Sequence, residues 1–233
     1  MDDRLRGFGG NAYTLKIGQD QEELLVPGNI LTLVPYFKKA LSSGSFTEST
    51  TKTFELPDDD PKAVADVLYY AYTGQVPAVP YHPATSREDA QGLEPFLRAY
   101  ITADKYKAES TSNKLVDRII EFQSGNLMNP GTLWILGDAG LHDTPLYKLM
   151  AKEMMYQLQF GGYDADWDVY FLGTDQETST FAEACRRLSK EDMVHIMTYG
   201  NGLRYGWKDS CPALEASKNL CSYHKHEISE PCV

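Results

Sequence analysis

The sequence has little positive charge and no long hydrophobic run. No stretch approaches the ~18 consecutive apolar residues that a membrane helix needs, so we expect no membrane span. Residues 1–6 lead into glycines without an apolar segment, so we expect no secretory signal and a location in the cytoplasm or the nucleus. The 22 Lys and Arg residues against 33 Asp and Glu give a net charge of −11, with no basic stripe. This charge disfavours nucleic acid and anionic membrane surfaces as partners.

Motifs typical of enzymes are missing too. The glycines of residues 7–10 precede an expected strand instead of linking a strand to a helix, so they are not a phosphate-binding loop. No Gly-x-Ser-x-Gly sequence is present. Residues 164–168 begin like an EF-hand loop, but Val169 stands where that loop requires Gly, so an acidic surface loop is the better interpretation. We therefore expect a protein that is not an enzyme.

Apolar periodicity predicts strands only near the N-terminus. The expected strands span residues 12–17, 22–26 and 53–56. Two short helices are expected in series from Asn29, the second beginning at Pro35 and ending before Gly44. A longer helix is expected from Pro61 to Gly74, with Asp60 as its N-cap.

Beyond residue 74 the pattern is helical only. Residues 75–92 are rich in proline and are expected to form an exposed loop. Helical stripes of apolar residues follow it, beginning near Leu93, Leu115, Pro130, Pro145, Thr178 and Lys190. A few short strands mixed with short helices, followed by helices alone, predict an α+β fold with an all-helical extension.

Several motifs in residues 12–122 resemble a BTB/POZ domain, an intracellular protein–protein interaction module. They are Val34-Pro35-Tyr36-Phe37, Phe46-Thr47-Glu48-Ser49, Phe54-Glu55-Leu56-Pro57, Tyr69-Tyr70-Ala71-Tyr72-Thr73-Gly74 and Tyr100-Ile101-Thr102-Ala103-Asp104-Lys105-Tyr106. The resemblance implies a small mixed sheet with a cluster of short helices. The whole layout is similar to the compact single-BTB proteins of fungi, which have a helical C-terminal region and a Cys/His-rich end.

The resemblance gives the expected domain organisation. An N-terminal tail of residues 1–11 precedes the BTB/POZ domain of residues 12–122, which includes the loop 75–92. A helical extension occupies residues 123–200, and a Cys/His-rich tail occupies residues 201–233.

Phe46 and Glu48 are the candidate partner-binding residues. They stand where cullin-recruiting BTB domains carry a hydrophobic residue, any residue and then Glu. In those domains the apolar side chain inserts into the cullin and the carboxylate fixes the neighbouring loop. The alternative is that Phe46 covers the local core and that Glu48 is merely solvated.

The C-terminal tail holds five candidate metal ligands, whereas Cys185 stands apart from them. They are Cys211, Cys221, His224, His226 and Cys232. In a reducing compartment such a cluster indicates metal before disulfides, and one structural zinc ion would take four of the five. We expect His224 and His226 both to be ligands only if the backbone turns between them. The alternative is a tail with incidental cysteines and histidines, or an adventitious disulfide.

Two functional hypotheses follow. The first is a non-enzymatic interaction module that mediates self-association as a homodimer or binds protein partners, with a substrate adaptor of a cullin ubiquitin ligase as its specific form. The second is a zinc-stabilised transcriptional or nucleic-acid-associated regulator. The net charge disfavours the second hypothesis, because the tail offers few phosphate contacts, with Lys208, Lys218 and Lys225 as its lysines.

Overall fold

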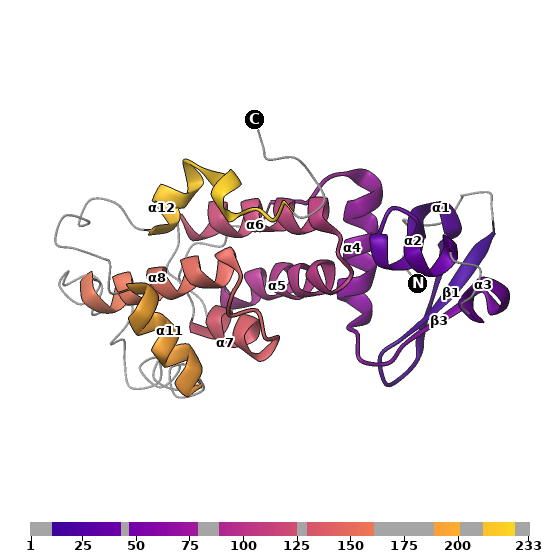
Figure 1. Ribbon diagram of the computed structural model, residues 1–233, viewed down its shortest axis with the longest axis horizontal. Helices are drawn as coiled ribbons and strands as arrows, with labels where there is room; N and C mark the ends of the chain where they lie inside the picture. Colours follow the sequence, from indigo (N-terminus) through magenta and orange to yellow (C-terminus); the bar gives the residue numbers. More distant parts are fainter. Residues whose placement is uncertain are drawn as a thin grey trace. The chain divides into compact units, whose positions relative to one another are not determined.

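The computed structural model describes residues 11–42, 47–78, 89–124, 130–160, 189–200 and 212–226 (Figure 1). Contacts between Cα atoms divide the chain into two compact units. The first unit comprises Met1–Pro77, Arg98–Leu115 and Lys225–Glu230; the second comprises Ala78–Leu97, Val116–His224 and Pro231–Val233. No helix among the described residues is both long enough and apolar enough to cross a bilayer.

A three-stranded sheet begins the first unit. Its strands are β1 (Ala12–Ile17), β2 (Glu22–Pro27) and β3 (Thr53–Leu56), in the order β2-β1-β3. β1 pairs antiparallel with β2 and parallel with β3, so the sheet is mixed. Leu15 lies opposite both Leu24 and Phe54 and is fully buried, which places the hydrophobic side of the alternation in the core. All three strands were predicted, and the mixed sheet is confirmed.

Short helices follow the second strand. They are α1 (Gly28–Leu31), α2 (Pro35–Ser42) and α3 (Thr47–Thr51). The chain breaks between α1 and α2 because the ring of Pro35 cannot continue a helix but fits the first position of a new one. The first two helices were predicted. α3 was not, because its five residues show no apolar periodicity.

Helix α4 (Pro61–Thr73) is bounded as the sequence predicts. The Asp60 side chain accepts a hydrogen bond from the Ala63 amide at 2.8 Å, and Gly74 ends the helix at φ 67°. At that positive φ a Cβ would be strained, so glycine is the favoured C-terminal residue. The two signals fix one buried helix at both ends.

The N-cap of α4 gives a test of this local structure. Replacing Asp60 with Ala should lower the free energy of unfolding by about 1 kcal/mol, because the Ala63 amide loses its partner. The exposed Asp58 is the matched control, and Asp58→Ala should change stability far less. Urea denaturation followed by circular dichroism measures both, and equal losses would contradict the capping role.

Two longer helices come next, α5 (Asp89–Lys105) and α6 (Glu109–Gln123). α5 begins inside the stretch 75–92 that the sequence predicts as loop, and it contains Pro95. The prediction of a loop treated the glycine and prolines of this stretch as stronger helix breakers than they are here. Burial of Leu93, Phe96 and Leu97 favours the helix by several kcal/mol and offsets their cost.

Aromatic rings fill the centre of the first unit. Phe37 on α2 is fully buried, and its ring lies edge-on to Phe54 of β3 at 5.2 Å between centroids. Tyr106, just after α5, lies 5.1 Å from Phe37 and stacks on Tyr36 at 5.0 Å. These contacts join sheet and helices, so the core depends on residues far apart in the sequence.

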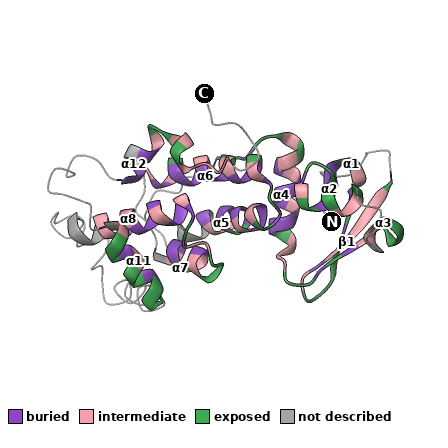
Figure 2. Ribbon diagram, viewed as in Figure 1, coloured by how far each residue is buried: buried purple, intermediate pink, exposed green. Residues whose placement is uncertain are grey.

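The second unit is helical in its described part. Its elements are α7 (Pro130–Asp138), α8 (Pro145–Phe160), α11 (Lys190–Gly200), α12 (Pro212–Ser217) and the 3₁₀ helix η3 (Leu220–Tyr223). The other four all pack on α8. Buried residues lie along α7 and α8, where the ribbon is purple in Figure 2. The predicted helices near Pro130, Pro145 and Lys190 are present, and the one predicted from Thr178 lies outside the described residues.

One buried carboxylate connects three parts of the second unit. Ser189 caps α11 by accepting from the Asp192 amide at 3.0 Å, and the Asp192 carboxylate accepts from the Ser189 amide at 2.8 Å. The same carboxylate accepts from the Tyr147 hydroxyl of α8 at 2.5 Å and lies 3.2 Å from His142 Nε2. A Cβ at Gly137 of α7 would lie 2.5 Å from Asp192 Oδ1, so the acid needs glycine there.

These partners shift the pKa of two groups. Burial alone would raise the pKa of Asp192, but hydrogen bonds from Tyr147 and Ser189 and the nearby His142 outweigh it and hold that pKa below its usual range. Burial and the Asp192 hydrogen bond raise the pKa of the Tyr147 hydroxyl far above its usual value. The carboxylate is therefore ionised and the phenol neutral near neutral pH.

Candidate functional site

The first candidate surface is formed by α2 and α3 in the first unit. α3 packs against α2 and β3, and its first turn carries Glu48, which is half-buried. Lys52 ends this helix at φ 55°, and its amide donates to the Glu48 carbonyl at 2.9 Å. Glu48 thus lies on a short helix that packs against both α2 and β3.

Phe46, the other residue predicted for this surface, lies outside the described residues. Two apolar side chains nearby in the sequence are exposed: Leu33 with 51% of its surface accessible and Tyr36 with 46%. Exposed apolar side chains are typical of a protein-binding surface. The structure thus describes one of the two predicted residues.

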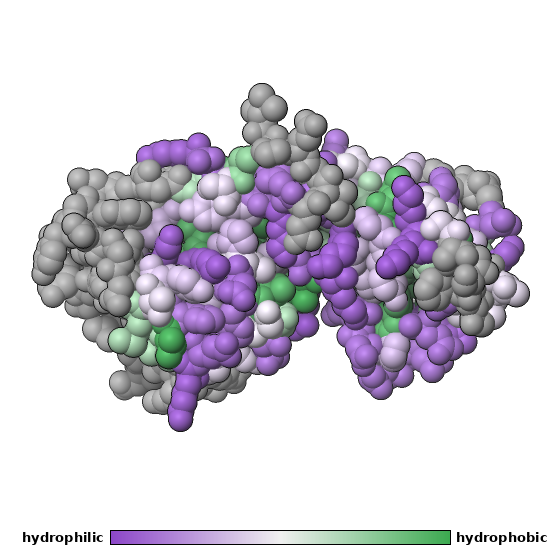
Figure 3. Space-filling view, in the orientation of Figure 1, coloured by the Kyte–Doolittle hydropathy of each residue, from purple (hydrophilic) through white to green (hydrophobic). Residues whose placement is uncertain are grey.

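A second exposed apolar surface lies on α11. Met193, Val194 and Met197 are between 44% and 59% accessible and occur at helical spacing. Figure 3 shows apolar surface over this helix. The apolar stripe expected from Lys190 comprised Met193, Ile196 and Met197; the structure buries Ile196 and leaves the two methionines exposed.

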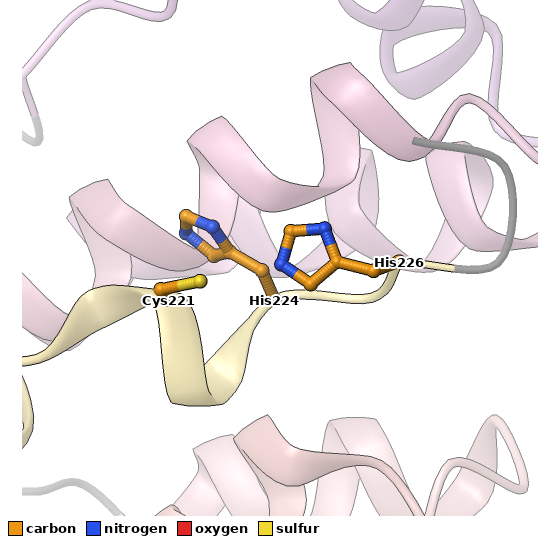
Figure 4. A group of neighbouring side chains, drawn as sticks. All are labelled: Cys221, His224 and His226. Atoms are coloured by element: carbon orange, nitrogen blue, oxygen red, sulfur yellow. The ribbon is translucent and has the colours of Figure 1, made fainter. Parts of the chain in front are cut away.

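The second candidate site is a cluster of side chains in the C-terminal segment. Ligand atoms of Cys221, His224 and His226 all lie within 4.8 Å of one another (Figure 4). The three residues belong to one continuous stretch of six, so the turn of that stretch sets their distances. Cys221 and His224 fall three apart across η3, where a 3₁₀ helix superimposes residues i and i+3.

Contacts with α6 and α5 hold this segment. His224 Nε2 lies 2.6 Å from Asp117 Oδ1 on α6. The Lys225 amide donates to Asn113 Oδ1 at 2.9 Å, and the Lys225 carbonyl accepts from Asn113 Nδ2 at 2.8 Å. Lys225 Nζ also forms an ion pair with Asp104. Lys225, the residue between the two histidines, is therefore held by hydrogen bonds at both its amide and its carbonyl.

Of the five predicted metal ligands, the structure brings three together. Cys211 and Cys232 lie outside the described residues. The three described side chains offer one thiol and two imidazoles, the donor types that zinc prefers. The expected turn between His224 and His226 is not what brings the two rings together: the chain is extended at His224, and residues two apart in an extended chain lie on the same face.

Three supporting residues were not found from the sequence. Asn113, Asp117 and Asp104 are separated by more than a hundred positions from the segment they hold. The available signal was the i, i+4 spacing of Asn113 and Asp117, which puts both polar groups on one face of α6. Lys225 is also engaged by Asp104, which leaves this lysine a poor phosphate contact for the nucleic-acid hypothesis.

Comparison with known proteins adds one finding. Residues 30–121 match the BTB/POZ domain family. The match runs from α1 to α6 and includes α3 with Glu48. No curated protein matches the chain.

Proposed function

We propose that this chain, which contains a BTB/POZ domain, recruits a cullin scaffold through α3 and the residues before it, as a substrate adaptor of a ubiquitin ligase. BTB/POZ domains are generally protein–protein interaction modules, often self-associating, and are not enzymes. The match over residues 30–121 carries the interaction role, since this region includes the sheet edge β3 and the helices around it. The cullin is the specific partner that we add.

The support for a cullin comes from α3. Glu48 stands in the first turn of a helix that packs on α2 and β3, so its place on the backbone is defined. Phe46 precedes it by two residues, which is the spacing of the hydrophobic residue and the acid in cullin-recruiting domains. An apolar anchor beside a fixed charge gives both affinity and orientation at a protein interface.

An adaptor also needs a surface for its substrate. The exposed apolar side chains of α11, Met193, Val194 and Met197, supply one on the second unit. Methionine suits such a surface because its flexible side chain adapts to different partners. On this proposal the BTB/POZ domain binds the ligase and α11 binds the substrate.

The cullin proposal is tested by a pull-down with purified cullin scaffold. The double variant Phe46→Ala/Glu48→Ala should reduce capture by ten-fold or more, because loss of an anchor residue costs about 2 kcal/mol or more of binding. Thr50→Ala is the matched control, since Thr50 is exposed on the same helix. Equal capture of the double variant and the wild type would remove these residues from the interface.

Self-association is the second property that we propose for the BTB/POZ domain. Light scattering on the purified full chain should give twice the mass of one chain across a range of concentrations. The exposed Leu33 and Tyr36 are candidate contacts, because burying them on dimerisation removes apolar surface from water. A mass equal to one chain at all concentrations would contradict self-association without affecting the cullin proposal.

A further inference from the structure

We propose that Cys221, His224 and His226 bind one zinc ion, and that Asp117 of α6 positions His224 for it. The inference is independent of the cullin proposal, since no residue of α2 or α3 takes part. It assigns the ring nitrogen that binds the metal and a positioning residue that the sequence pattern alone does not indicate.

The geometry of the three donors is close to that of a zinc site. With Zn–S near 2.3 Å and Zn–N near 2.0 Å, the ligand atoms of a tetrahedral site lie roughly 3.3–3.5 Å apart. In the structure the three ligand atoms are all within 4.8 Å of one another. Small side-chain rotations that move these ligand atoms by about an ångström therefore bring them to metal-binding distances. Figure 4 shows the sulfur of Cys221 and both imidazole rings on one side of the segment.

Local backbone structure explains why these side chains meet. The 3₁₀ turn η3 places Cys221 and His224 above one another, and the His224 amide donates to the Cys221 carbonyl at 3.1 Å. The chain then becomes extended at His224, with φ −81° and ψ 154°. The anchored Lys225 follows, and His226 comes directly after it. Because residues two apart in an extended chain lie on the same face, His226 points to the same side as His224.

Asp117 determines which nitrogen of His224 faces the metal. A carboxylate can only accept a hydrogen bond, so the Nε2 atom 2.6 Å away must carry the proton. The neutral ring then has its lone pair on Nδ1, and this atom is the metal ligand. A carboxylate that accepts from the other nitrogen of a metal-bound histidine is the usual arrangement, and it strengthens the ligand. Asp117 does not belong to the group of donors, so it acts through His224.

Two features favour binding before any metal arrives. Asn113 holds the peptide of Lys225 by two hydrogen bonds, which fixes the backbone between the two histidines. The side chain of His224 is 9% exposed, so its ring has little freedom to turn away. A site whose ligands are already oriented loses little entropy when the ion binds.

The test measures the metal directly on the full chain. Protein purified with zinc in the buffer and then dialysed should retain about one zinc per chain. Replacing the zinc with cobalt should give the absorption bands of tetrahedral cobalt bound to a thiolate. Cys221→Ser should abolish the thiolate band, and His226→Ala should lower zinc content several-fold. Cys185→Ser, which changes a cysteine outside the cluster, should leave both unchanged.

Asp117→Asn separates the positioning role from a merely structural one. It should weaken zinc affinity about 10–100-fold while the ligands themselves stay in place. Glu121→Gln on the same helix is the matched control, because its carboxylate is exposed and forms an ion pair with Arg118. Asp117→Glu should recover part of the affinity.

Three results would overturn the proposal. Wild-type protein with less than about a tenth of a zinc per chain and no cobalt spectrum would show that there is no site. Zinc retained in full by both Cys221→Ser and His226→Ala would place the metal elsewhere. Unchanged affinity in Asp117→Asn would remove the role of Asp117. If a ligand variant fails to fold, the zinc content of the wild type and the zinc affinity of Asp117→Asn still test the proposal.

Discussion

Replacing Phe37 with Ala should lower the free energy of unfolding of the first unit by about 3–5 kcal/mol. The ring is fully buried and lies against both Phe54 of β3 and Tyr106 after α5, so its removal leaves a cavity where sheet and helices meet. Backbone shifts cannot easily close that cavity, because the neighbouring rings are themselves fixed by further contacts.

The matched control for this substitution is Leu33→Ala. Leu33 is 51% exposed, so its truncation should cost less than about 1 kcal/mol. Among the described residues the only tryptophan is Trp134 on α7 of the second unit, so tryptophan fluorescence is a poor readout for this change. Hydrogen exchange at the amides of α2 and β3 measures it instead. Equal protection in the two variants would show that Phe37 is not central to the core.

Replacing Asp192 with Ala should lower the free energy of unfolding of the second unit by about 3–5 kcal/mol. The change leaves the buried Tyr147 hydroxyl and the Ser189 amide without their acceptor, and each such group costs about 1–3 kcal/mol. Asp192→Asn keeps the shape of the side chain and one acceptor oxygen, so it should lower the free energy of unfolding by less. The adjacent Glu191 is exposed, and Glu191→Ala is the control. Urea denaturation followed by tryptophan fluorescence reports on this unit.

The same carboxylate gives a pH dependence. The folded pKa of Asp192 lies below its unfolded value near 3.9, so its contribution is complete above about pH 4 and is lost as the pH falls through the folded pKa. Asp192→Asn should therefore be less stable than wild type at pH 7 and lose less of its stability on acidification. Parallel stability curves for the two proteins between pH 2 and 7 would contradict this assignment.

The local elements of the first unit could be read from the sequence. The alternation of apolar and polar residues predicted β1, and Asp60 and Gly74 predicted the two ends of α4. Each of these signals acts within a few residues of the element that it predicts. α3 could not be predicted in the same way. It is a single turn of threonine and serine around Glu48, and its packing on α2 and β3 holds it in place.

The candidate metal site was predictable only in part. The spacing of Cys221, His224 and His226 indicated them as candidate ligands, since their geometry is local. The role of Asp117 could not be predicted, because it depends on α6 and the C-terminal segment lying together after folding. The Asp192 network was missed for the same reason, since Tyr147 and His142 reach it from residues about 45 to 50 positions earlier. Pattern analysis finds donors that are neighbours in the chain, and the residues that orient them require the fold.

The close approach at Gly137 constrains how this protein can evolve. Since even a methyl group at that position would collide with the carboxylate of residue 192, a side chain at 137 requires a change at 192. A homologue that gains a side chain at 137 should lose the acid at 192, and the tyrosine at 147 should then become an apolar residue of similar size. Such linked changes at positions 137, 147 and 192 would preserve the helical unit. They would replace the hydrogen-bonded group at its centre with packed apolar side chains.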